Sequence, residues 1–276
     1  PATTLSLNCY YSMFEGSKLT SAPELPAETL ADSCYYSMFA FCTDLNKVPA
    51  LPADTLAPNC YHRMFNGCTG LRAMPALPAT TLGKECYREM FQGCTNLTEA
   101  PDLPATTLTE ICYLGMFQDC TGLTTAPALP ATTLTESCYY AMFQNCTSLT
   151  TAPELPATTL AESCYTYMFA DCTDLNYIKV HFTSWADDHS APTIGWVWNV
   201  SDTGTFVCPE GLDVSEEDPS HVPEGWTVER ISGINSPVMD NRFDPNGVIH
   251  NVSGQRVDEN YKGILIQNGK KYLRRH

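Results

Sequence analysis

Cysteine is the residue type with the most obvious chemical potential in this chain, with 14 among 276 residues. The cysteines recur in two sets, represented by Cys138 and Cys146, and members of a set lie 25 or 26 residues apart. Such sets could form disulfides or bind zinc. The chain contains no Cys-x-x-Cys pair and no histidine at a fixed place in the repeat. We therefore predict no metal site and no cofactor, because structural zinc sites draw four ligands from short spacings.

Residue types used in nucleophilic catalysis also occur side by side, as Asp187-Asp188-His189-Ser190. Catalytic triads are assembled from distant segments, so adjacency in one loop does not indicate a triad. The chain has no Gly-x-Ser-x-Gly, no His-Glu-x-x-His and no glycine-rich phosphate loop. The sequence therefore predicts no catalytic residue and a protein that is not an enzyme.

The cysteines belong to a tandem repeat that accounts for most of the composition. One proline marks the period of 26 residues, and a shorter first copy begins at Pro1. The marker prolines are Pro26, Pro52, Pro78, Pro104, Pro130 and Pro156. Fixed positions of the seven copies hold 13 of the 14 cysteines and 13 of the 20 prolines. The fold must therefore be built from repeated units.

Within the copy at residues 130–155, a four-residue spacing of apolar side chains predicts a helix of about three turns. The stripe consists of Leu134, Cys138, Met142 and Cys146. Thr133 and Glu136 have the spacing of a capping box at the start of such a helix. Ala141 lies off the stripe, and we expect it to be exposed.

The segment 149–155 follows the predicted helix and has the pattern of a short strand with one side open to solvent. Neighbouring strands lie about 4.8 Å apart and neighbouring helices about 8–10 Å apart, so such a stack must curve. The predicted fold class is α/β: a curved solenoid of seven repeats, each a strand, a turn and a helix. Equivalent cysteines on adjacent helices would exceed the ~7 Å limit for a disulfide, which favours thiols that fill the core.

The repeated motif resembles a known family. Leu-Pro-Ala-Thr-Thr-Leu followed by Cys-Tyr-x-x-Met-Phe-x-x-Cys-Thr-x-Leu is similar to the BspA-like leucine-rich repeats on surface proteins of Bacteroidetes-type bacteria. The central part of the motif stands here as Phe143, Cys146 and Leu149, and the resemblance covers residues 1–182. It implies a leucine-rich-repeat solenoid and an adhesive role at the cell surface.

Composition divides the chain into three parts. Residues 1–182 form the repeat array, and residues 183–230 hold all four tryptophans and are predicted to cap its end. Residues 231–276 are predicted to be a small β-rich module, with hairpins that turn at Ser253-Gly254 and Asn268-Gly269.

Charge and hydropathy restrict the partners and the location. The net charge of −16 disfavours nucleic acid, whose phosphates would be repelled. No apolar run approaches the ~18 residues of a membrane span. The chain opens in mid-pattern with no basic or apolar leader. We therefore expect a signal peptide to have been removed, and the family resemblance implies an extracellular or outer-surface location.

These observations predict a surface or secreted binding protein whose concave face binds a protein or a glycan, with host molecules among the candidates. The predicted binding residues are Lys47, Arg72, Glu99, Asp102 and Glu154. The alternative is a carbohydrate-binding protein that uses tryptophans of the cap as a stacking platform. The residues of that platform would be Trp185, Trp196 and Trp198.

Overall fold

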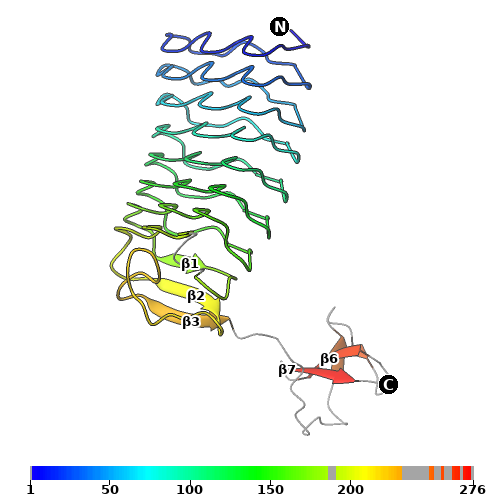
Figure 1. The fold of residues 1–276 in the computed structure, drawn as a ribbon, viewed down its shortest axis with the longest axis vertical. Helices are drawn as coiled ribbons and strands as arrows, with labels where there is room; N and C mark the ends of the chain where they lie inside the picture. Colours follow the sequence, from blue (N-terminus) through cyan, green and yellow to red (C-terminus); the bar gives the residue numbers. More distant parts are fainter. Residues whose placement is uncertain are drawn as a thin grey trace. The chain divides into compact units, whose positions relative to one another are not determined.

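A computed structural model describes residues 2–185 and 191–231, together with the backbone of four short strands between residues 249 and 274. The chain divides into two compact units, Pro1–Arg230 and Ile231–His276. In the first unit the chain winds into a stack of similar coils (Figure 1). Up to residue 182, each coil corresponds to one copy of the sequence repeat. Backbone hydrogen bonds join consecutive coils, as from Tyr139 N to Cys164 O at 3.1 Å.

The predicted α/β fold, a leucine-rich-repeat solenoid of strand–turn–helix units, is wrong. Across the residues that the structure describes there is no helix, and the first unit has three short strands. They are β1 (Tyr177–Lys179), β2 (Thr205–Pro209) and β3 (Thr227–Ile231), in the sheet order β1-β2-β3. β1 pairs with β2 in parallel. The coils before β1 are therefore built from turns and single bridges.

Left-handed backbone replaces the expected helix. In the coil at residues 130–155, φ is positive at Ser137 (51°), Ala141 (51°) and Asn145 (58°), which is every fourth residue. Left-handed residues cannot continue a right-handed helix. Amides alternate between two partners: Tyr139 N bonds to the next coil, whereas Tyr140 N bonds to Ser137 O, three residues back, at 3.3 Å. The segment is thus a row of four-residue turns whose free amides join the coils.

A spacing of exactly four residues suits these turns better than it suits an α-helix. Each residue of an α-helix turns by about 100°, so four residues overshoot a full turn by about 40°. From Leu134 to Cys146 the overshoot would reach about 120°, and the stripe would leave the core. In four-residue turns every fourth side chain keeps its direction. Ala141, which we expected to be exposed, is buried.

Stacked aromatic rings fill the interior of the coils. Tyr113 stacks on Tyr139 with ring centroids 5.8 Å apart, and Phe117 stacks on Phe143 at 5.7 Å. These separations fall in the favourable range for aromatic pairs. They also fit coils joined by backbone hydrogen bonds, whereas packed helices would hold equivalent rings about 8–10 Å apart. The same contacts recur from coil to coil and form two continuous columns of rings.

The cysteines are part of this packing. All 14 are free thiols, and Cys9 alone among them is exposed. In the second set each thiol donates a hydrogen bond to a carbonyl of the preceding coil, as Cys146 Sγ does to Phe117 O at 3.1 Å. Burial raises the pKa of Cys120 to about 12 and that of Cys146 well above its usual value. The buried thiols therefore stay protonated and are poor nucleophiles.

Prolines explain why the extended segments do not form regular strands. In residues 149–155 the contact with the next coil is reduced to two bridges, Thr151↔Tyr177 and Leu155↔Val180. Pro153 and Pro156 lack the N–H that a ladder needs. In the last copy Lys179 and Phe182 occupy the equivalent positions, and there β1 forms.

The predicted cap begins with another coil. Residues 191–199 repeat the turn geometry, with positive φ at Ala191, Gly195 and Asn199. Phe169 N bonds to Trp196 O at 2.8 Å, so this coil continues the hydrogen-bond register of the array. Trp196 is fully buried and stacks on Tyr165, with a centroid separation of 6.3 Å. Beyond it, β2 and β3 complete the sheet.

The second unit contains a four-stranded sheet in the order β5-β4-β6-β7. Its strands are β4 (Ile249–Asn251), β5 (Arg256–Val257), β6 (Gly263–Gln267) and β7 (Lys270–Arg274). The predicted hairpins correspond to the antiparallel pairs β4/β5 and β6/β7. Their predicted turn residues, 253–254 and 268–269, lie outside the described residues.

Candidate binding surface

The predicted binding residues lie on exposed positions of the bridging segments, which we call the bridge face. Lys47 and Glu99 occupy equivalent positions, because both form parallel bridges, to Ser21 and Thr125 respectively. Arg72 and Asp102 are also exposed. The bridge face therefore presents these charges on three consecutive coils, at different positions of the repeat, and not in one pocket.

Glu154 differs from the other four predicted residues because it is paired within the chain. Its Oε1 accepts hydrogen bonds from Lys179 Nζ at 2.8 Å and His181 Nε2 at 2.6 Å. These two hydrogen bonds lower the pKa of Glu154. By contrast, Lys47 and Arg72 make no ion pair within the part of the chain that the structure describes. Those two cations are available to a partner.

A shallow groove of about 590 Å³ has Asp102 in its lining, and other lining residues follow Arg72 and Glu99 closely in the sequence. Two neighbouring coils line it with Met74, Pro75, Ala76, Leu77, Pro78, Ala100, Pro101, Asp102 and Pro104. The floor is apolar and rich in proline, and Asp102 itself belongs to the lining. Charge and apolar surface thus occur together on the bridge face. Sequence reasoning missed the groove, although the repeated Pro-x-Leu-Pro of each copy was the signal for it.

The three tryptophans of the alternative site do not form one exposed platform. Trp196 is buried, and Trp185 is half-buried with its ring centroid 6.0 Å from that of Trp196. Trp185 Nε1 donates to Asp213 O at 2.6 Å, which fixes the ring in the cap. Trp198 is 57% exposed. A stacking site in the cap would therefore have to rely on Trp198.

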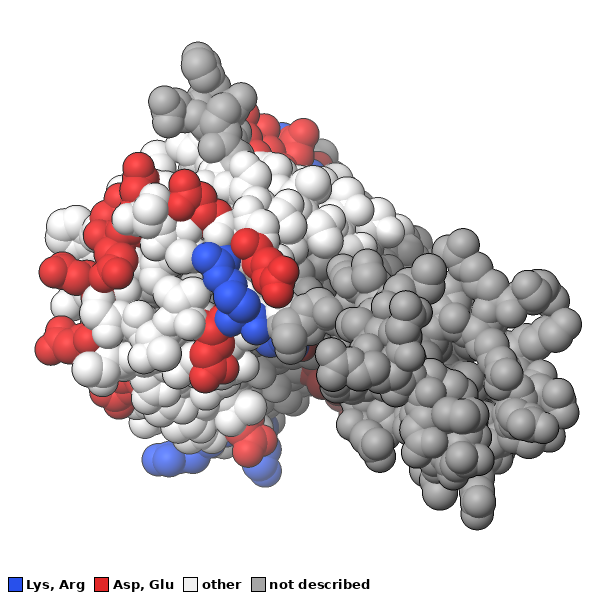
Figure 2. All heavy atoms as spheres, turned by 90° about the horizontal axis from the view of Figure 1, so that it is seen from below, with Lys and Arg blue, Asp and Glu red and all other residues white. Residues whose placement is uncertain are grey.

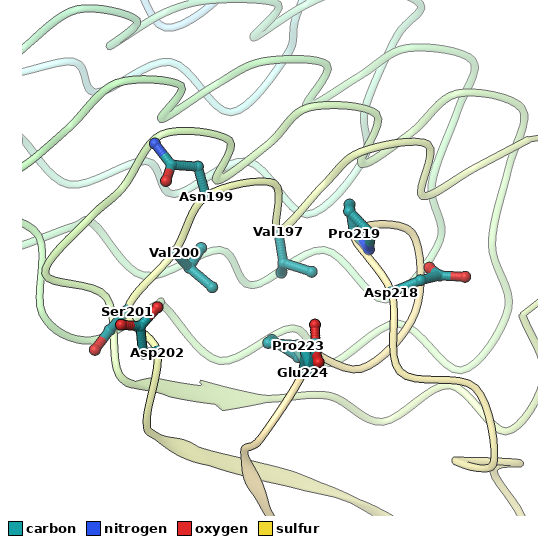
Figure 3. A pocket seen from close by; sticks show the side chains of 9 residues that line it. All are labelled: Val197, Asn199, Val200, Ser201, Asp202, Asp218, Pro219, Pro223 and Glu224. Atoms are coloured by element: carbon teal, nitrogen blue, oxygen red, sulfur yellow. The ribbon is translucent and has the colours of Figure 1, made fainter.

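A smaller pocket of about 210 Å³ lies in the cap close to Trp198 in the sequence (Figure 3). It is lined by Val197, Asn199, Val200, Ser201, Asp202, Asp218, Pro219, Pro223 and Glu224. Two of its three carboxylates, Asp202 and Glu224, are exposed. Asp218 is already engaged, because it accepts hydrogen bonds from Ser220 N and from His221. The pocket is smaller than the usual ligand site of about 300–1,000 Å³.

Three possible metal ligands, Glu216, Asp218 and His221, also lie near this pocket, with ligand atoms within 4.8 Å of one another. Each ring nitrogen of His221 already faces a carboxylate, with Nδ1 3.0 Å from Asp218 and Nε2 3.3 Å from Glu216. A metal ion would have to displace one of these contacts. The Asp187–Ser190 run lies outside the described residues.

Acidic side chains are spread over the face of the first unit seen in Figure 2, with few basic side chains among them. This matches the excess of 31 acidic over 15 basic residues. The described residues include no helix long and apolar enough to cross a membrane. No family model, curated protein or solved structure matches the chain.

Proposed function

We propose that this chain is a non-enzymatic binding protein, displayed on the cell surface or secreted, that uses its bridge face to hold an extended protein segment or glycan. The observation that carries the proposal is the groove of about 590 Å³, with Asp102 in its lining, beside charged positions on consecutive coils. Extended faces of repeat proteins suit partners that span several repeats. The resemblance of the Phe-x-x-Cys motif to BspA-like surface repeats supports the location and the adhesive role.

The chemistry of the repeat supports a binding role over a catalytic one. The recurring thiols and phenols are buried, and burial raises the pKa of Cys146 and of Tyr139 well above their usual values. Groups in that state do not serve as nucleophiles or as general bases near neutral pH. Their recurrence follows from packing between coils.

The experiment begins with a panel of extracellular-matrix proteins and a glycan array, probed with the full chain. The Lys47→Glu, Arg72→Glu variant is then compared with a matched Lys18→Glu, Lys84→Glu variant. Both variants change the net charge equally, and Lys18 and Lys84 are exposed cations off the bridge face. We expect the first variant to lose at least about tenfold in affinity and to keep the parental Tm, and the control to bind normally. Equal affinity of the two variants would contradict the proposal.

Carbohydrate binding through the cap is the second candidate function, and the exposure of Trp198 favours it. Under this alternative, Trp198→Ala abolishes binding to the glycan array, whereas Lys47→Glu, Arg72→Glu leaves it intact. That outcome would place the binding site in the cap.

A further inference from the structure

Phe41 occupies a backbone position that suits no bulky side chain. Its φ is 59°, and its side chain is 56% exposed. The equivalent positions of the other coils hold only glycine, asparagine or aspartate, which tolerate left-handed backbone. These residues are Gly16, Gly67, Gly93, Asp119, Asn145, Asp171 and Asn199. A phenylalanine here carries the cost of left-handed backbone and stays more than half exposed, which is typical of residues that contact a ligand.

The ring of Phe41 forms one wall of a slot. A Cβ atom added at Gly67 would lie only 2.5 Å from Cδ1 of Phe41, so the ring lies over Gly67. Gly93 lies one coil further. A Cβ atom added there would have the Gly67 backbone as its nearest neighbour, at 3.6 Å, so the space above Gly93 is open. Asp119 occupies the same position in the following coil and belongs to the same pocket of about 410 Å³. Gly93 therefore forms the floor of the slot, and the ring of Phe41 and the carboxylate of Asp119 form its two sides.

The polar groups around the slot leave negative charge unpaired. Asp119 Oδ1 accepts a hydrogen bond from Asn145 Nδ2 at 2.8 Å, and its second oxygen bonds to no described residue. Glu15 also lines the pocket and makes no ion pair with a described residue. The one cation in the lining, Arg63, pairs with the buried Glu89. Glu89 also pairs with Arg88, and Arg88 pairs with Glu85, so these two arginines and two glutamates compensate one another. The slot thus offers an aromatic face and an available carboxylate.

We infer that this slot binds an arginine side chain of a basic partner peptide. The planar guanidinium stacks on the face of Phe41 and donates hydrogen bonds to Asp119. The net charge of −16 steers basic partners toward the chain. Lysine would bind more weakly, because its ammonium is strongly hydrated and cannot stack as a plane. The inference concerns other positions than the bridge face and does not depend on the proposed function.

The test measures fluorescence anisotropy of labelled hexa-arginine and hexa-lysine with the full chain, at about 0.15 M salt. We expect hexa-arginine to bind roughly fivefold to thirtyfold more tightly. Phe41→Asn, which installs a residue type found at this position in other coils, should abolish that preference. It should also keep or raise the Tm, because the left-handed strain is relieved. Loss of the preference for hexa-arginine would then not reflect misfolding.

Asp119→Asn has a closely matched control in Asp171→Asn. Asp171 occupies the same position two coils on, has left-handed backbone and accepts a hydrogen bond from Asn199 Nδ2 at 2.9 Å. We expect Asp119→Asn to weaken hexa-arginine binding roughly fivefold or more, and Asp171→Asn to leave it unchanged. Equal affinity for the two peptides in the parent would overturn the inference. So would equal losses in the two aspartate variants, or a preference for arginine that survives Phe41→Asn.

Discussion

At the scale of single residues, the buried columns of rings predict that substitutions in the core and at the surface differ strongly in their effect on stability. Phe117 is fully buried and stacks on rings of both neighbouring coils, whereas Leu7 is exposed in the first coil. We expect Phe117→Ala to lower the free energy of unfolding by about 3–5 kcal/mol. Leu7→Ala should change it by less than about 0.5 kcal/mol. Urea unfolding of both variants checks this, and similar midpoint shifts would contradict the assignment of the core.

The thiols should be reduced and mostly unreactive in the native protein. Cys9 is exposed and the other 13 cysteines are buried. A thiol reagent should therefore modify about one cysteine rapidly under native conditions, and all 14 once the chain is unfolded without reductant. A markedly lower count after unfolding would reveal disulfides and contradict the packing.

His62 should make stability depend on pH. It is 5% exposed, and its Nε2 has no hydrogen-bond partner among the described residues. Burial, with a smaller contribution from Arg88, lowers the pKa of His62 to about 4. As pH falls below the ordinary histidine pKa of about 6.5, the unfolded chain takes up a proton and the folded chain does not. The free energy of unfolding should therefore fall by about 2 kcal/mol between about pH 7 and pH 5.

His62→Gln should remove most of that pH dependence, because glutamine does not titrate. His181→Gln is the control, since His181 lies half-exposed beside Glu154. Urea titrations at a series of pH values provide the measurement. A slope that persists in His62→Gln would assign the effect to other groups.

At the scale of elements, the four-residue turns replace the expected helices and reverse the effect of glycine. Ser137 has a φ of 51°, whereas Ala161, in the next coil, lies outside the left-handed region. Glycine at position 137 removes left-handed strain, so Ser137→Gly should raise the free energy of unfolding by about 1 kcal/mol. Ala161→Gly should lower it by about 0.5–1 kcal/mol. A helix would lose stability from both changes, and that result would contradict the turns.

The sequence could predict the elements that leave a recurring residue pattern, but not those whose backbone is set by contacts between coils. The buried columns of Cys, Tyr, Phe and Leu could be predicted, because recurrence in every copy requires a shared interior. The turns could not, since left-handed backbone falls on residues such as Ser137 and Ala141 that do not favour it. Thr133 and Glu136 have capping-box spacing without a helix to cap. Contact with the next coil, not local propensity, fixes the backbone there.

The candidate site was predictable in part for the same reason. Apolar residues recur at every third position of the bridging segments, and Lys47 and Arg72 fall between them, at positions that are exposed. The pairing of Glu154 with Lys179 and His181 depends on the register between coils, which no single copy reveals. The burial of Trp196 likewise follows from the extra coil at residues 191–199, which lacks the cysteines that mark the other copies.

At the scale of the whole molecule, hydrogen bonds between coils and continuous columns of rings hold the first unit together. Each coil depends on its neighbours, because its alternate amides find partners only in the next coil, as Phe143 N does with Met168 O at 2.9 Å. Stability should therefore be shared along the stack. The same register brings the charged residues of neighbouring coils onto the bridge face.

Far-UV circular dichroism of the full chain tests the central claim, that the repeats are coils of turns without helices, most directly. We expect a spectrum without the helical double minimum, because the described residues contain turns, bridges and short strands. An array of seven three-turn helices would instead give that double minimum strongly. A clearly helical spectrum from the native protein would contradict the account.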